Sequence, residues 1–125
     1  MTQALLLIDH GSRREAANRM LEEVAELVRA RRPGLIVRAA HMELAPPNVA
    51  TGFSACVEAG ATEVVAMPYF LFRGRHAAED VPRLVEEAAA QHPGVLWRVA
   101  DPLGLHPLLA EVVLERAALG GDPAP

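Results

Sequence analysis

Two histidines stand where the chain leaves an apolar segment and turns. His10 follows the apolar run 4–9 and precedes Gly11. His76 occupies a matching place, in the loop after the apolar run 64–67. A neutral imidazole nitrogen can bind a divalent metal or accept a proton. If the two runs are neighbouring strands, both imidazoles come within reach of one metal ion, and two histidines leave its coordination incomplete, which suits a metal that is handed on.

Each of these residues also has a simpler interpretation. A histidine in a turn between a strand and a helix can cap the helix or bond a neighbouring carbonyl group. Asp9 can orient His10, although adjacent strand residues face opposite sides. His92 and His106 stand beside prolines of turns, and we expect both at the surface.

Glu43 is the third candidate for chemistry. It follows the second apolar run beside Met42, where a carboxylate can take up a proton or support a metal ligand. It can equally be a solvated charge at the end of a strand. We expect His41 on the opposite side of the strand from Met42, at the surface or behind the site.

The loop before the third helix is basic and aromatic. It contains the run Tyr69-Phe70-Leu71-Phe72 and then Arg73-Gly74-Arg75-His76. In open α/β sheets, ligands bind at the loops that follow the carboxyl ends of the strands. Guanidinium groups suit carboxylates and phosphates, and their alternative role is that of solvated surface charges.

Strands and helices alternate along the chain. Strands are expected at 4–9, 35–40, 64–67 and 95–99, and helices at 15–30, from Pro46 to a cap at Gly60, from an N-cap at Asp80 to about Gln91, and from Pro107. A start of the third helix a few residues before Asp80 is the alternative. This alternation predicts an α/β fold of three layers, in which a four-stranded parallel sheet carries helices on both faces. The strand order expected is 2-1-3-4, as in flavodoxin-like folds.

Composition limits the classes of function. The 125 residues, 51% of them hydrophobic, suit a single domain over 1–119, with 120–125 expected to be a disordered tail. The net charge is −4, and no basic run is long enough to indicate nucleic acid. No apolar run approaches the ~20 residues of a membrane span, and Met1-Thr2-Gln3 does not resemble a signal peptide, so we expect a cytoplasmic protein. The single cysteine, Cys56, is expected to be a small buried residue.

Three motifs together resemble a known family. They are DHGSR at residues 9–13, MELAPPN at 42–48 and the pattern G-x-H-x-x-x-D-[IV]-P at 74–82. Their order and spacing resemble the small CbiX/SirB-type sirohydrochlorin chelatases, and the resemblance spans nearly the whole chain. It implies the class II chelatase fold, of which a chain this short is one half, working as a homodimer. Asp9 departs from the small residue expected before His10.

The resemblance also implies an activity and a set of residues. The activity is insertion of a divalent metal into a sirohydrochlorin-type tetrapyrrole, with no permanently bound cofactor. The metal that we expect is Co²⁺, for cobalamin biosynthesis. Siroheme formation with Fe²⁺, insertion of Ni²⁺ and a non-catalytic metal or tetrapyrrole carrier are the alternatives. His10 and His76 match the metal-binding residues, and both are catalytic together with Glu43. The substrate-binding residues expected are Arg13, Met42, Glu43, Leu71, Phe72, Arg73, Gly74 and Arg75.

A histidine phosphatase is the rival from another class of enzyme. Its first strand ends in R-H-G, and its histidine becomes phosphorylated. Here Asp9 replaces that arginine, and a carboxylate beside the nucleophile would repel phosphate. The sequence therefore favours metal chemistry over phosphoryl transfer.

Overall fold

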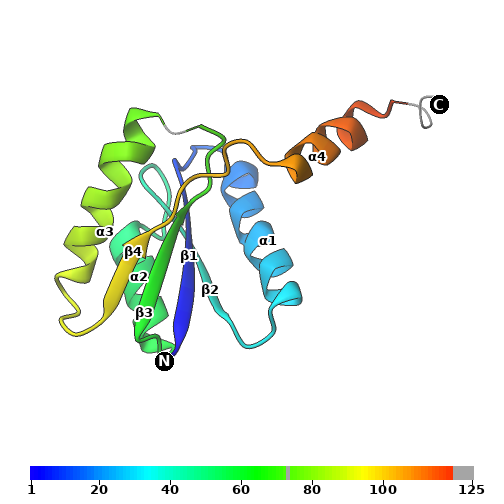
Figure 1. Cartoon of the computed structure of the whole chain (residues 1–125). Helices are drawn as coiled ribbons and strands as arrows, with labels where there is room; N and C mark the ends of the chain where they lie inside the picture. The colour runs from blue at the N-terminus through cyan, green and yellow to red at the C-terminus, as the bar shows by residue number, and fades with distance from the viewer. Residues whose placement is uncertain (73, 120–125) are drawn as a thin grey trace.

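A four-stranded parallel sheet forms the centre of the computed structural model, which describes residues 1–72 and 74–119 but not the side chains of His76 and Ala77 (Figure 1). Its strands are β1 (Gln3–Asp9), β2 (Ile36–His41), β3 (Glu63–Pro68) and β4 (Leu96–Val99). They lie in the order β2-β1-β3-β4, all parallel. The predicted strand order is confirmed, and the carboxyl ends of β1, β2 and β3 share one edge.

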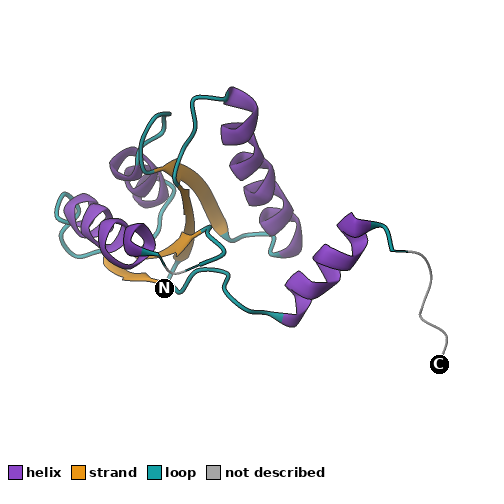
Figure 2. Ribbon diagram, turned by 90° about the horizontal axis from the view of Figure 1, so that it is seen from above, coloured by secondary structure: helices purple, strands orange, loops and turns teal. Residues whose placement is uncertain are grey.

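Helices cover both sides of this sheet, as predicted. α1 (Glu15–Arg31) lies on one side, while α2 (Val49–Glu58) and α3 (Val81–Ala89) lie on the other (Figure 2). The larger core lies under α2 and α3, where Phe53 is fully buried, and a smaller one under α1 is built around Leu21. Alternate residues of β1 serve the two cores: Leu6 faces the larger one and Leu7 the smaller one.

α2 begins and ends on signals that the sequence carries. The Asn48 side chain accepts a hydrogen bond of 2.8 Å from the backbone N–H of Thr51 and so caps the helix. Gly60 follows the helix with a φ of +109°, a conformation that favours glycine, and its N–H donates to the carbonyl of Val57. The prediction of a cap at Gly60 is confirmed, although the helix begins at Val49, after the two prolines.

α3 begins after Asp80, as predicted, but helical backbone starts a few residues earlier, which is the predicted alternative. A π-helical turn, His76–Asp80, leads directly into α3, and the N–H of Ala78 already donates to the carbonyl of Gly74 at 2.9 Å. Because Asp80 itself has helical dihedral angles, its side chain makes no cap hydrogen bond. Its carboxylate instead lies 3.8 Å from a guanidinium nitrogen of Arg83, one turn further along.

α4 (Pro107–Ala117) differs from the other helices. It leads away from the sheet in both views, and none of its residues is buried (Figures 1 and 2). The His106 ring accepts a hydrogen bond of 3.1 Å from the N–H of Leu108 and caps this helix at an exposed position, as expected for that histidine. Among the described residues, no helix is long and apolar enough to cross a membrane. The predicted tail at 120–125 lies outside the described residues.

Candidate functional site

The loops after β1, β2 and β3 are joined beyond the ends of the strands. The N–H of Met42 donates to the carbonyl of Asp9 at 2.9 Å, and the N–H of Glu43 donates to the carbonyl of His10 at 3.1 Å. On the other side of β1, the N–H of Tyr69 donates to the carbonyl of Ile8 at 2.7 Å. These bonds bring His10, Glu43 and the aromatic loop to one edge, as the predicted topology requires.

Gly11 lets the first two loops approach this closely. Its φ is +89°, and a Cβ added there would lie 1.8 Å from the carbonyl oxygen of Glu43. A distance that short is a clash with backbone, so only glycine fits between the two loops. The residue after His10 therefore sets the position of Glu43 relative to that histidine.

His10 is exposed, and its ring lies against an aromatic face. The His10 and Phe70 rings stack with centroids 4.4 Å apart and an angle of 28° between their planes. Phe70 packs in turn on the larger core, as does the half-buried Met42. The imidazole thus rests on a platform anchored in the core while remaining accessible to a ligand.

The half-buried Asp9 and the buried His41 form a pair behind this platform. The Asp9 carboxylate lies 2.5 Å from His41 Nδ1, and the same carboxylate oxygen accepts a hydrogen bond of 3.0 Å from the N–H of Gly11. His41 is only 4% exposed. Of the two places predicted for it, the surface is therefore wrong, and a place behind the site is what the structure shows. Asp9 and His41 are register partners of β1 and β2, so both side chains point to the face of α1. Asp9 therefore holds the backbone beside His10 instead of its ring.

The start of α1 fixes the other end of the His10 loop. The Asn18 side chain accepts a hydrogen bond of 2.9 Å from the N–H of Ser12 and donates one of 2.7 Å to its carbonyl. The Ser12 hydroxyl accepts a further hydrogen bond from the N–H of Arg14. His10 consequently sits on a loop that is held from both ends, and Arg13 projects from it as an exposed side chain.

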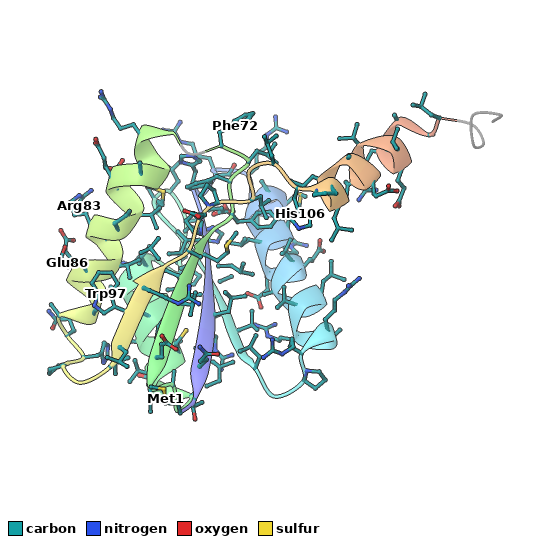
Figure 3. All side chains as sticks on the ribbon, viewed as in Figure 1. Met1, Phe72, Arg83, Glu86, Trp97 and His106 are labelled. Atoms are coloured by element: carbon teal, nitrogen blue, oxygen red, sulfur yellow. The ribbon has the colours of Figure 1, made fainter. Side chains whose placement is uncertain are left out.

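The aromatic loop after β3 presents apolar side chains to solvent at the same edge. Leu71 is 54% exposed and Phe72 is 80% exposed, and Figure 3 shows Phe72 at the top of the molecule beyond the ends of the strands. Gly74 and Arg75 are also exposed. Arg73 and the side chain of His76 lie outside the described residues, so the predicted pairing of His10 with His76 stays a prediction.

The loop that follows β4 also belongs to this edge, which the sequence analysis missed. The N–H groups of Leu103 and Gly104 donate to the carbonyls of Phe70 and Leu71, both at 2.9 Å. The turn residues Pro102 and Gly104 were the available signal, since they mark a turn close to the predicted end of the fourth strand. These two hydrogen bonds hold the backbone of the aromatic loop in place at Phe70 and Leu71.

Two further sequence predictions concern residues away from the edge. His92 is half-buried and not at the surface, because its Nε2 lies 2.8 Å from the Ser54 hydroxyl and its ring stacks on Phe53 at 5.6 Å. Cys56 is buried, as predicted, and burial raises the pKa of its thiol to about 11. Within 1–72 and 74–119, setting aside the side chains of His76 and Ala77, no three histidine, cysteine or acidic side chains are grouped to hold a metal.

Comparison with known families identifies this arrangement. A family model described as CbiX matches residues 4–119. The chain belongs to the CbiX family. This CbiX domain is 45% identical, over 90% of its own length, to a chloroplastic sirohydrochlorin ferrochelatase of Arabidopsis thaliana, of which it covers 50%. It is 31% identical to a sirohydrochlorin cobaltochelatase of Methanococcoides burtonii, covering 90% of the chain and 92% of that relative.

Solved structures agree with the family assignment. SirB from Bacillus subtilis subspecies spizizenii, a sirohydrochlorin chelatase solved in complex with cobalt, matches with a TM-score of 0.86 at 30% identity. That match covers 94% of this CbiX domain and 50% of SirB. A putative cobalamin biosynthesis CbiX protein from Marinobacter aquaeolei VT8 matches with a TM-score of 0.75 at 30% identity, covering 93% of this CbiX domain and 94% of that chain. The domain thus spans about half the length of several relatives and nearly all of others.

Proposed function

We propose that this CbiX domain is a sirohydrochlorin chelatase, which inserts a divalent metal into the tetrapyrrole. The observation that carries the proposal is the accessible His10 on its rigid loop, stacked on Phe70 at the edge where the strand loops meet. The names of the relatives from Arabidopsis and Methanococcoides support the same substrate.

The geometry suits the chemistry that insertion needs. The metal must lose its hydration shell while the two pyrrole N–H protons leave the ring, so a metal ligand and a proton acceptor are needed near one point. An imidazole can serve in either role while neutral. His10 takes this position in the proposal, with His76 of the following loop as the second ligand.

The surroundings of His10 suit the tetrapyrrole itself. The ring of the substrate is flat and apolar, and its rim is rich in carboxylates. Phe70, Phe72 and Leu71 offer apolar surface beside His10, and Arg13 and Arg75 are exposed cations at the same edge. Aromatic and aliphatic contacts would hold the ring, while guanidinium groups would pair with its carboxylates.

The metal separates two versions of the proposal. The sequence favours Co²⁺ by resemblance, whereas the 45% identical relative is named a ferrochelatase. Imidazole ligands accept Co²⁺, Fe²⁺ and Ni²⁺ alike. Steady-state insertion rates for Co²⁺ and Fe²⁺, measured anaerobically on the same preparation, distinguish them. A protein that binds sirohydrochlorin without accelerating the formation of either product would be a carrier and would overturn the proposed activity.

Glu43 has two possible roles that one variant separates. If Glu43 is a proton acceptor, Glu43→Gln should lower the insertion rate by ~10² or more and leave the metal affinity nearly unchanged. If Glu43 is a metal ligand, the insertion rate and the metal affinity should fall together. Calorimetric titration of metal into the variant, beside its insertion rate, gives both numbers. A variant that matches the wild type in both removes Glu43 from the site.

The proposal includes two features of the protein in solution. The first is a homodimer, supported by the half-length match to the Arabidopsis and Bacillus relatives and by a site with a single wall. The second is a cytoplasmic location, which we retain from the sequence although the Arabidopsis relative is named chloroplastic.

A further inference from the structure

The last residues of β1 and β2 tie the loops of the candidate site together from behind. Asp9 and His41 end these two strands in register. The Asp9 carboxylate oxygen that lies 2.5 Å from His41 Nδ1 also accepts the hydrogen bond of 3.0 Å from the N–H of Gly11. Hydrogen bonds to an ionised carboxylate are stronger than those between neutral groups. One oxygen atom therefore joins the strand that leads to Glu43 to the residue that follows His10.

His41 is the fixed member of this pair. Its side chain is buried, whereas that of Asp9 is half-buried. The backbone N–H of His41 donates to the carbonyl of Pro47 at 2.9 Å, and its side chain lines a hollow between α1 and the loop after β2. A side chain that is locked by burial and by its own backbone can hold a more mobile partner in one orientation. His41 thus sets the position of the Asp9 carboxylate.

The backbone contact at Gly11 transmits this position to the site. The N–H of Glu43 donates to the carbonyl of His10, and the space where a Cβ of Gly11 would stand is filled by the carbonyl oxygen of Glu43. A displacement of Gly11 must therefore move Glu43 or change its separation from His10. For groups that act together in catalysis, a misplacement of ~1 Å can lower the rate by ~10²-fold.

The apolar surface beside His10 is held by other contacts. The N–H of Tyr69 donates to the carbonyl of Ile8, and the loop after β4 donates two further hydrogen bonds to the aromatic loop. The His10 ring stacks on Phe70, which packs on the core under α2 and α3, whereas the side chain of His41 points to the face of α1. Loss of the pair should consequently leave this apolar surface in place.

We propose that His41, acting through Asp9, is a positioning residue for metal insertion, which keeps the backbone of His10 in register with Glu43. The inference rests on the proposed chelatase function and adds to it a residue that contacts neither the metal nor the tetrapyrrole. It predicts a split effect on the kinetics. Loss of His41 should lower kcat and leave KM for sirohydrochlorin unchanged, because the pair orders the reacting groups and not the surface that receives the ring.

Two substitutions of His41 test this role. His41→Phe keeps a buried ring but removes the nitrogen that contacts Asp9, and we expect kcat for anaerobic metal insertion to fall by ~10-fold or more. In His41→Asn, the side-chain amide N–H can take the place of Nδ1–H and donate to Asp9. This variant should therefore regain most of the rate that His41→Phe loses.

His92→Phe is the matched control. His92 is half-buried, and its Nε2 lies 2.8 Å from the Ser54 hydroxyl, away from the site. The control thus also replaces a histidine ring by a phenyl ring and removes one hydrogen bond to a side chain. It should keep the wild-type kcat, with urea denaturation confirming that both phenylalanine variants are folded under assay conditions. An equal fall of kcat in the two variants would reduce the effect to general destabilisation and overturn the proposal.

Amide hydrogen exchange gives a readout that does not depend on activity, because it reports the opening of individual backbone hydrogen bonds. His41→Phe should accelerate exchange at Gly11 and Glu43, whose N–H groups join the two loops, and leave Tyr69 unchanged. Unaltered exchange at Gly11 and Glu43 would show that the pair does not hold the loops.

The kinetic outcomes are equally decisive. A wild-type kcat in folded His41→Phe, a raised KM with unchanged kcat, or no recovery in His41→Asn would each contradict a positioning role. A wild-type protein that inserts no metal would instead overturn the proposed chelatase function, and hydrogen exchange would still decide whether His41 holds the two loops together.

Discussion

At the residue scale, Gly11 is the position at which the two loops of the site meet. Gly11→Ala forces a Cβ onto the carbonyl oxygen of Glu43 at a φ of +89°. We expect it to lower the free energy of unfolding by about 2 kcal/mol or more, because both the backbone strain and the clash must be relieved. Urea denaturation measures this loss.

Gly34 provides the matched control for this substitution. Its φ of +93° is nearly the same, but an added Cβ would meet nothing within 4 Å. Gly34→Ala should therefore cost only the backbone strain, about 1 kcal/mol. Equal losses for the two variants would contradict a close approach of the loops at Gly11.

Cys56 gives a pH dependence of stability with a definite sign. Burial raises the pKa of its thiol from 9.0 to about 11, opposed by the guanidinium of Arg38. In the unfolded chain the thiol ionises near pH 9, so below that pH both states are protonated and stability is unaffected. Between pH 9 and about 11 the thiol ionises in the unfolded chain but stays protonated in the folded one. Ionisation stabilises the unfolded state, so the free energy of unfolding falls by on the order of 1–3 kcal/mol.

Cys56→Ala isolates this contribution from other groups that titrate at high pH. Urea denaturation of both proteins from pH 7 to 10.5 should show a steeper decline for the wild type above pH 9. Parallel curves would mean that the thiol does not control stability in this range.

The sequence predicted the right edge for His10 and Glu43 but the wrong surroundings for His41. Position after a strand is enough to place a residue at the edge of a parallel sheet. The partner of Asp9, in contrast, depends on the register of β1 against β2, which sets Asp9 directly beside His41. Register is a long-range property, and hydrophobic alternation within one strand does not reveal it.

At the element scale, side-chain caps mark where α2 and α4 begin. Asn48→Ala should lower the free energy of unfolding by about 1 kcal/mol, since the N–H of Thr51 loses its acceptor. Asn48→Asp keeps an oxygen in that place and should retain most of the stability. Thermal or urea unfolding of the pair checks this, and a full loss in Asn48→Asp would show that the amide has another role.

The elements themselves were largely predictable, and their junctions were not. Apolar runs and turn residues located all four strands, and their alternation with helices led to the observed strand order. The sequence left two starts open for α3, because Asp80 has the residue type of a cap, and only the structure shows that the backbone is already helical from His76. The direction of α4 could not be predicted either. The same spacing of apolar residues fits a helix that packs on its own sheet and a helix that leads away from it.

At the scale of the whole molecule, the candidate site has a wall on one side only, and α4 leaves the domain from the same edge of the sheet. The edge with His10 faces solvent, and α4, which follows this edge, has no fully buried residue. In the proposed homodimer, a second copy would supply a second wall for a flat tetrapyrrole. Assembly and catalysis would then depend on the same end of the sheet.

The initial rate of anaerobic metal insertion into sirohydrochlorin by His10→Ala tests the central claim most directly. His10 is exposed, so the variant should keep its fold although it loses the ring stack on Phe70, worth ~0.5–1.5 kcal/mol. We predict a rate at least ~10²-fold below that of the wild type, as for the loss of a positioned ligand or base. Glu58→Ala, an exposed change at the end of α2, should retain the full rate. A wild-type insertion rate in folded His10→Ala would contradict the proposed site.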